Sequence, residues 1–299
     1  MIDLEETLKA GDLPSDVIPH LLWGEILEGA SKRRVFLNAV TVTDKLRNAT
    51  GTKLSVPILS TRFSGATISE SSLDTSGYSV SDPAITDTDI NIGDQVYVAF
   101  RISDILKEDQ PMYDFVRLLL RDAGRAIAEY EDGAIRDVLL AGAGNSLSAG
   151  SAGTLAYDDV IDALKLAKED SWFPDDVTPM LFVHPDQEAD LLKDTRYVQS
   201  HRYAVGSLPE LPVADDTVPA SGTYAGCKVF VTNNMTKALA LVVFPSHPRF
   251  GPVAIHAYKR PLTIRTDREE LYGRQLYIAS MRYGTSVIQA NAVVLISNC

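Results

Sequence analysis

Residues 121–144 read RDAGRAIAEYEDGAIRDVLLAGAG, and this stretch decides the fold that the sequence predicts. Pro111 stands where a helix tolerates proline, in its first turn, and Gly142 and Gly144 end the helix. About 30 residues rising 1.5 Å each would form a rod of about 45 Å, longer than a small domain needs. Apolar residues at spacings of three and four predict one stripe along it: Phe115, Leu119, Ala123, Ile127, Tyr130, Ala134 and Val138.

The composition is that of an acidic globular protein. With 299 residues and 45% hydrophobic content, the chain can bury a sizeable core in one or two domains. Its net charge of −12 repels phosphate backbones, which argues against a dedicated DNA-binding protein. The start, MIDLEETLKAGDLPSD, lacks the basic and then apolar pattern of a signal peptide, and no apolar run approaches the roughly 18 residues of a membrane span. We therefore expect a protein that stays in the cytoplasm of the cell that makes it.

On the N-terminal side of this helix, the sequence predicts an arm followed by strands. Residues 1–34 hold two short amphipathic pieces broken by glycine and proline, so this arm should dock on something else. Strand-like runs follow at 35–42, 53–59 and 95–102. Residues 61–94 are rich in Ser, Thr, Asp and Gly and too long for an ordinary loop. They are either disordered or a binding element that gains order from a partner.

On the C-terminal side, the pattern indicates an α/β subdomain and then further strands. Residues 143–153 form a flexible Gly/Ser-rich linker, 157–168 an amphipathic helix, 180–183 a buried strand and 186–192 a short helix. The remaining strands are expected at 228–232, 238–244, 253–258, 262–266, 275–282, 285–289 and 292–296.

No catalytic, cofactor or metal site is predicted. The chain contains neither G-x-S-x-G nor G-x-x-x-x-G-K-[ST], and Gly142 and Gly144 lack the third glycine and the preceding strand of a dinucleotide site. Two reduced thiols are expected, Cys227 at a strand start and Cys299 on a frayed terminus. The five histidines never lie at i, i+4 spacing and are interpreted as turn or surface residues: His20, His184, His201, His247 and His256.

The acidic residues of the long helix are interpreted as a solvated ion-pair face. Glu129, Glu131 and Asp132 have Arg125 and Arg136 as helical neighbours at i, i+4 spacing. Because the sequence shows no recognisable set of reactive side chains, the arm and the long polar segment are better explained by association between subunits. Both would lose ordering entropy unless neighbouring subunits covered them, so the sequence predicts an oligomer.

Four stretches in order resemble tailed-phage major capsid proteins, the Hong Kong ninety-seven type fold. Residues 121–144 resemble the spine helix of that family. LFVHPDQEADLLKDTRY (181–197) is similar to its strand, turn and short helix, and YAGCKVFVTNNM (224–235) to its glycine, strand and Thr-Asn element. REELYGRQLYIASMRYGTSVIQANAVVLI (268–296) resembles its C-terminal strands. The resemblance extends from about residue 35 to the end.

This resemblance implies an α+β fold with five parts. They are an N-terminal arm (1–34), an E-loop β-hairpin with flanking strands (35–102), a P-domain spine helix and linker (103–154), an A-domain of mixed sheet and helices (155–257), and C-terminal strands of the P-domain (258–299). The implied function is that of a major capsid protein, not an enzyme. Its pentamers and hexamers would form an icosahedral shell around double-stranded DNA, without sequence-specific binding or a membrane.

The resemblance also implies partners and contacts. The virion is the expected location, with assembly in the host cytoplasm. Because no scaffolding segment fits before the hairpin, a separate scaffolding protein is expected beside a portal, and a decoration protein is left open. Arg47, Lys53 and Arg62 of the hairpin would pair with acidic residues on the adjacent subunit, and Tyr78 would also contact it. Some relatives cross-link this hairpin through a Lys-Asn bond, but Lys53 lies near its start, so no cross-link is expected.

Three other interpretations remain open. The first is an encapsulin-like nanocompartment shell subunit, which shares the fold but houses a cargo enzyme. The second is a non-catalytic structural α+β protein that stays small, and the third is an enzyme. Light scattering distinguishes a shell of hundreds of copies from a small protein. Whether isolated particles contain DNA distinguishes a phage capsid from an encapsulin-like shell.

Overall fold

A computed structural model of the chain describes residues 34–47, 49–59, 85–109, 112–150, 153–170, 177–193, 222–245 and 251–299. The predicted arm, except Arg34, lies outside these ranges, as do most of the hairpin's distal part and the residues His20, Arg62, Tyr78, His201 and His247. The fold is α+β, as predicted. Within these described ranges, it contains three sheets and one dominant helix.

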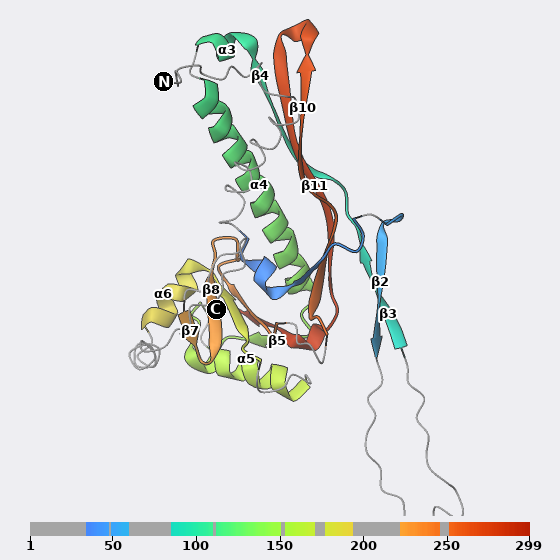
Figure 1. Cartoon of the computed structure of the whole chain (residues 1–299). Helices are drawn as coiled ribbons and strands as arrows, with labels where there is room; N and C mark the ends of the chain where they lie inside the picture. Colours follow the sequence, from blue (N-terminus) through green and yellow to red (C-terminus); the bar gives the residue numbers. More distant parts are fainter. Residues whose placement is uncertain are drawn as a thin grey trace, which may run out of the picture.

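The dominant helix is α4 (Met112–Ala141), which ends just before Gly142, as Gly142 and Gly144 predicted. It lies along a long β-ribbon for much of its length (Figure 1). The predicted apolar stripe was partly wrong, because the buried face is rotated relative to it. Ala123 and Ile127 are buried, but Tyr130 is 62% exposed, while Leu120, Ile135 and Leu139 form the core.

A four-stranded sheet packs against α4 in the order β1-β10-β11-β4. Its strands are β1 (Thr41–Thr43), β4 (Val96–Ser103), β10 (Ala254–Glu269) and β11 (Arg274–Val287). The sequence predicted two strands in place of β10 and two in place of β11. Each is one long strand. In β10 the polar interruption around Pro261 is absorbed as a register shift between Tyr258 and Thr263.

The ribbon formed by β10 and β11 ends in a one-turn 3₁₀ helix, η2 (Glu270–Tyr272), which packs near α3 (Asp104–Asp109). The backbone N–H of Asp104 donates to Gly273 at 2.9 Å. The face of the sheet turned toward α4 is apolar. Its core includes Leu120, Ile127 and Tyr277, and the ring of Tyr277 stacks on Phe100 at 5.1 Å.

The predicted hairpin is present as a separate two-stranded sheet. β2 (Lys53–Leu59) pairs antiparallel with β3 (Ile85–Asn91), from Lys53 opposite Asn91 to Leu59 opposite Ile85. It stands off the side of the body in Figure 1. The strand predicted at 35–42 is mostly the 3₁₀ helix η1 (Phe36–Ala39), because backbone N–H groups at its start bind a side-chain carboxylate and not a strand.

The third sheet has six strands in the order β5-β12-β9-β6-β8-β7. Helices α5 (Tyr157–Asp170) and α6 (Pro185–Lys193) accompany it, and both match their predictions within two residues. The strands are β5 (Asn145–Ser148), β6 (Met180–Val183), β7 (Gly222–Tyr224), β8 (Cys227–Val231), β9 (Leu239–Val243) and β12 (Val293–Ser297), the last preceded by the 3₁₀ helix η3 (Ala290–Ala292).

Two expectations for this region were wrong. The segment predicted as a flexible linker contains β5, which pairs in parallel with β12 and so gains order from residues about 150 positions away. Cys299 is not frayed: it is buried, because β12 carries it into the core and the Gln187 side-chain amide lies 2.9 Å from its sulfur. Cys227 does begin a strand, as a buried free thiol.

The five-part domain division stays a prediction. Two of its boundaries, at 155 and 257, separate β5 and β12 from strands with which they share a sheet. Their backbone hydrogen bonds join both strands to the sheet whose other strands lie within residues 155–257.

Candidate assembly surfaces

A buried polar cluster on α4 joins this helix to segments far away in the sequence. Glu131, fully buried, receives hydrogen bonds from Tyr258 at 2.5 Å and from His256 Nε2 at 3.1 Å. Arg34 Nε forms an ion pair with the other carboxylate oxygen of Glu131 at 2.7 Å. Burial alone would raise the pKa of Glu131, but the His256 hydrogen bond and the Arg34 charge outweigh burial and lower the pKa.

Asp132 holds the start of η1 against the helix. One of its carboxylate oxygens accepts the backbone N–H groups of Val35 at 2.8 Å and Phe36 at 2.7 Å. The other accepts from the side-chain amide of Asn234 at 3.2 Å. The carboxylate therefore joins the N-terminal segment, α4 and the turn after β8. Burial raises the pKa of Asp132 to about 6, although these three hydrogen bonds oppose the shift.

The cluster corrects two sequence interpretations. Glu131 and Asp132 are not on a solvated face; only Glu129 is, paired with Arg125 at 3.7 Å. His256 is not a surface residue but is fully buried, with its Nδ1 2.7 Å from the Thr285 hydroxyl. The sequence did not predict this buried cluster, because Arg34 and His256 are about 100 residues or more from Glu131 along the chain. One signal was available: Glu131 follows Ile127 and precedes Ile135 by four residues, on the buried face.

His184 matches its prediction as a turn residue. Its Nδ1 accepts the backbone N–H of Asp186 at 3.2 Å where α6 begins. Among the residues that the structure describes, no three His, Cys, Asp or Glu side chains gather closely enough to hold a metal ion. None of the described helices is long and apolar enough to cross a membrane.

The β2–β3 hairpin has one covered and one open face. Leu54, Val56 and Ile90 face inward, onto a small core that also contains Leu46 and Ile255. The alternate side chains, on the opposite face, are mostly exposed. We call this the hairpin outer face, and it consists of Lys53, Ser55, Pro57, Ile85, Asp87, Asp89 and Asn91.

Of the four predicted contact residues, the structure describes two. Arg47 is exposed in the turn before β2, where its backbone N–H donates to Asp44 at 2.9 Å. Lys53 is exposed but already pairs within the hairpin, with its Nζ 2.6 Å from Asp89. Arg62 and Tyr78 lie outside the described residues.

The hairpin is joined to the ribbon by a close backbone crossing. A Cβ on Gly284 of β11 would overlap the carbonyl oxygen of Asn91 at the end of β3, so only glycine fits there. Next to it, the N–H of Gly93 donates to Tyr283 at 3.0 Å, and Arg282 Nε donates to Gly93 at 2.9 Å. These contacts set the direction in which the hairpin leaves the body.

The four-stranded sheet also has an open face, on the side away from α4. Cross-strand partners share a face, so the register assigns to this side the rows Arg265–Ile278–Ala99, Asp267–Leu276–Arg101 and Thr263–Ser280–Tyr97. We call these nine residues the sheet outer face; all of them are at least partly exposed except Ser280, which is buried. Tyr97 is 65% exposed, the Arg101 side chain is 53% exposed, and Arg265 is exposed.

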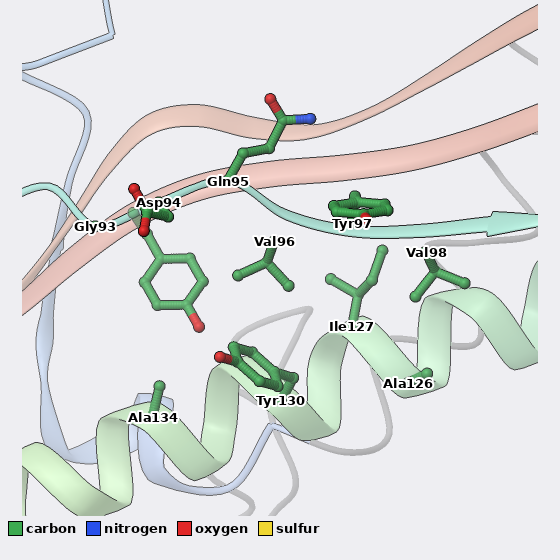
Figure 2. Close-up of a pocket in the computed structure, with 11 residues that line it drawn as sticks. Gly93, Asp94, Gln95, Val96, Tyr97, Val98, Ala126, Ile127, Tyr130 and Ala134 are labelled. Atoms are coloured by element: carbon green, nitrogen blue, oxygen red, sulfur yellow. The ribbon is translucent and has the colours of Figure 1, made fainter.

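A groove of about 680 Å³ runs along the edge of this sheet, between β4 and α4. Val96, Val98 and Ile127 form its apolar wall, and the exposed rings of Tyr97 and Tyr130 border its mouth. In Figure 2, Val96 and Val98 point toward α4 while Gln95 points away. The groove holds no reactive set of side chains, and Tyr97 connects it to the sheet outer face.

Comparison with known proteins agrees with the fold. The family model described as phage capsid protein matches residues 97–296. No curated protein matches the chain. Among solved structures, a chain of Mycobacterium phage Che8 is 17% identical, with 89% of this chain and 91% of that chain covered and a TM-score of 0.63.

Two further structures are similar at the level of fold. The capsid structure of cyanophage P-SCSP1u is 15% identical over 88% of both chains, with a TM-score of 0.64. A virus-like particle from Pyrococcus furiosus is 17% identical over 94% of this chain and 99% of that chain, with a TM-score of 0.62. At such identities, the likeness shows the fold alone. Because the family model covers more than half of the sequence, the chain belongs to the phage capsid protein family and is a major capsid structural subunit.

Proposed function

We propose that copies of this chain assemble as pentamers and hexamers into the icosahedral shell of a tailed phage. The shell encloses double-stranded DNA. Membership of the phage capsid protein family supports this proposal, and a structural family agrees with the expectation that the chain is not an enzyme. The net charge of −12 argues against sequence-specific DNA binding, because the subunit's summed field repels phosphate.

The observation that carries the proposal is the hairpin. A two-stranded sheet is marginally stable alone, yet β2 and β3 stand off the body with one face exposed. Such an element gains most by lying across a neighbouring copy, which buries its open face. In this assignment the hairpin is the E-loop, α4 with the long ribbon is the P-domain, and the six-stranded sheet with its helices is the A-domain.

The partners follow from this assignment. We propose a separate scaffolding protein and a portal, with assembly in the host cytoplasm before the subunit enters the virion. Arg47, Arg62 and Tyr78 remain proposed contacts with the adjacent subunit. Lys53 is a weaker candidate, because its ion pair with Asp89 already satisfies its charge.

Expression of the chain alone or with its scaffolding partner tests the proposal. Electron microscopy and light scattering should reveal closed particles of uniform diameter that contain hundreds of copies. A stable monomer under every condition tried, with or without the partner, would contradict the proposed shell. Particles isolated from infected cells should contain DNA; a protein cargo in its place would indicate the nanocompartment alternative, which the family match does not favour.

A further inference from the structure

The groove between β4 and α4 lies beside an open sheet edge. β4 ends the strand order β1-β10-β11-β4, and among the described residues no strand pairs with its other side. Backbone groups of β4 that point away from β11 can therefore accept a further strand. The facing helix surface carries the small side chains of Ala126 and Ala134, which leave room for a polypeptide backbone (Figure 2). An extended segment added along β4 would lie in this groove.

A buried hydroxyl group lines the groove. Tyr283 of β11 is 8% exposed, and among the described residues no group forms a hydrogen bond with its hydroxyl oxygen. Burial and the charge of Glu131 raise the pKa of Tyr283, so the phenol stays protonated and can both donate and accept a hydrogen bond. Buried polar groups are normally hydrogen-bonded. The backbone of a segment in the groove would offer Tyr283 a donor and an acceptor.

The charge at the start of β4 favours a positive ligand. Asp94 lines the groove, is exposed and has no ion-pair partner in the part of the chain that the structure describes. The arginines that contact its neighbours are engaged there. Arg282 Nε donates to the Gly93 carbonyl at 2.9 Å, and Arg260 Nη1 donates to the Gln95 side chain at 3.1 Å. The carboxylate of Asp94 therefore remains available to a cation from outside.

The other groove residues suit the rest of a basic side chain. Tyr97 is 65% exposed and Tyr130 62% exposed at the mouth of the groove, where their rings can contact a cation. Val96, Val98 and Ile127 form an apolar wall. Arginine and lysine combine an apolar stem with a charged head, so both parts of such a side chain find a matching surface.

The chain itself is a poor source of a basic segment. Its three longest ranges outside the described residues all carry more acidic than basic side chains: seven against three in 1–33, three against one in 60–84, and four against two in 194–221. A second copy has the same excess. With a net charge of −12, the chain attracts a basic protein and repels its own kind.

We propose that the groove between β4 and α4 is a docking site for an extended segment of a separate, basic partner protein. The segment pairs with the open edge of β4 and places apolar side chains against the groove wall. One of its basic side chains binds Asp94, and its backbone bonds with the Tyr283 hydroxyl. This inference does not depend on the proposed shell, because it concerns binding to the single subunit.

A model peptide tests the site. The probe is acetyl-Thr-Val-Arg-Val-Arg-Val-Thr-amide, titrated calorimetrically into the full chain in unassembled form. We expect a Kd below about 100 µM at low salt. The same peptide with glutamate in place of arginine should show no binding. A Kd of the arginine peptide above about 1 mM would overturn the proposal, including the case in which residues of this chain already occupy the groove.

Matched variants separate the site from general attraction between a basic peptide and an acidic protein. Asp94→Asn and Tyr283→Phe should each raise the Kd at least about fivefold. Ala126→Phe, at an exposed position, should block the groove and abolish binding. Asp162→Asn removes an equal charge from an exposed position on α5 and should stay within about twofold of wild type. Equal affinities in wild type, Asp94→Asn and Tyr283→Phe would overturn the proposal.

Two further measurements identify the mode of binding. Tyr283→Phe should not lower the unfolding temperature of the free subunit, because its hydroxyl has no partner there among the described residues. A lowered temperature would mean that this hydroxyl serves the fold and not a ligand. Peptide binding should slow hydrogen exchange at backbone amides of β4 at least about tenfold. Unchanged exchange in residues 96–103 would rule out strand addition, and none of these failures would affect the proposed shell.

Discussion

Asp132 shows how one buried carboxylate can connect elements far apart in the sequence. Its raised pKa of about 6, against an ordinary 3.8, means that the folded subunit binds a proton there more tightly than the unfolded chain. The contribution of Asp132 to the free energy of unfolding is therefore most favourable below pH 4 and is lost as the pH rises through 6. Burial is the cause, because it penalises the charged form.

This sign gives a prediction for unassembled subunits. Asp132→Asn keeps the side-chain shape and an oxygen that accepts from Val35 and Phe36, but removes the titration. The free energy of unfolding of wild type, relative to that variant, should rise by about 2 kcal/mol as the pH falls from 7 to 4.5. Urea unfolding at several pH values measures it. A difference that shrinks on acidification would show that the hydrogen bonds outweigh burial.

At the residue scale, the sequence predicted what depends on near neighbours. Glu129 and Arg125 form the predicted ion pair because four residues separate them on one helix. The buried role of Glu131 was not predicted, since its partners Arg34 and His256 come from η1's flank and from β10. Charged residues are almost never fully buried unless paired, and the pairing is set by the tertiary fold.

At the element scale, the Gly284 crossing is the most sensitive point of the hairpin. Gly284→Ala should lower the free energy of unfolding by about 1–3 kcal/mol, because the added methyl group overlaps the backbone of Asn91 and must push β3 away from β11. Denaturant unfolding measures the loss, and proteolysis should cut the hairpin faster.

A matched control is available at the same junction. A Cβ on Gly93 would meet the Tyr283 carbonyl oxygen at 3.6 Å, an ordinary contact. Gly93→Ala should therefore change stability much less than Gly284→Ala. Equal losses in the two variants would mean that backbone freedom, and not the close approach, is what the hairpin requires.

Elements were predictable where their signal is local. The period of α4 and α5 and the apolar run of β6 each contain enough information to define an element. β5 was missed because its order comes from parallel pairing with β12, and a Gly/Ser-rich composition gives no sign of that. The break predicted in β10 failed because a register shift at Pro261 lets one strand continue past a residue that cannot donate a hydrogen bond.

At the scale of the whole molecule, we expect the distal part of the hairpin to be needed for assembly of particles but not for folding of the subunit. Replacing residues 60–84 by Asn-Gly would close the hairpin directly between Leu59 and Ile85, which already pair. The core under the hairpin, including Ile90, Ile92 and Leu54, stays intact. We expect a subunit with nearly unchanged thermal unfolding that places less than about a tenth of its mass in particles, compared with wild type.

Sedimentation velocity and differential scanning calorimetry on one preparation would check both parts. Particles at wild-type yield would show that the distal hairpin is dispensable for the shell. A large drop in the unfolding temperature would show that the hairpin serves the subunit and not the assembly.

The pairing of β1 with β10 has a consequence for the timing of synthesis. Thr41 lies beside Ile255, and the core beneath the hairpin joins Leu46 and Ile90 to Ile255 and Ala257. A nascent chain on the ribosome lacks this foundation until more than 250 residues have been made. We therefore expect the hairpin to acquire its fixed orientation late in translation, so that incomplete chains would not present it to finished subunits.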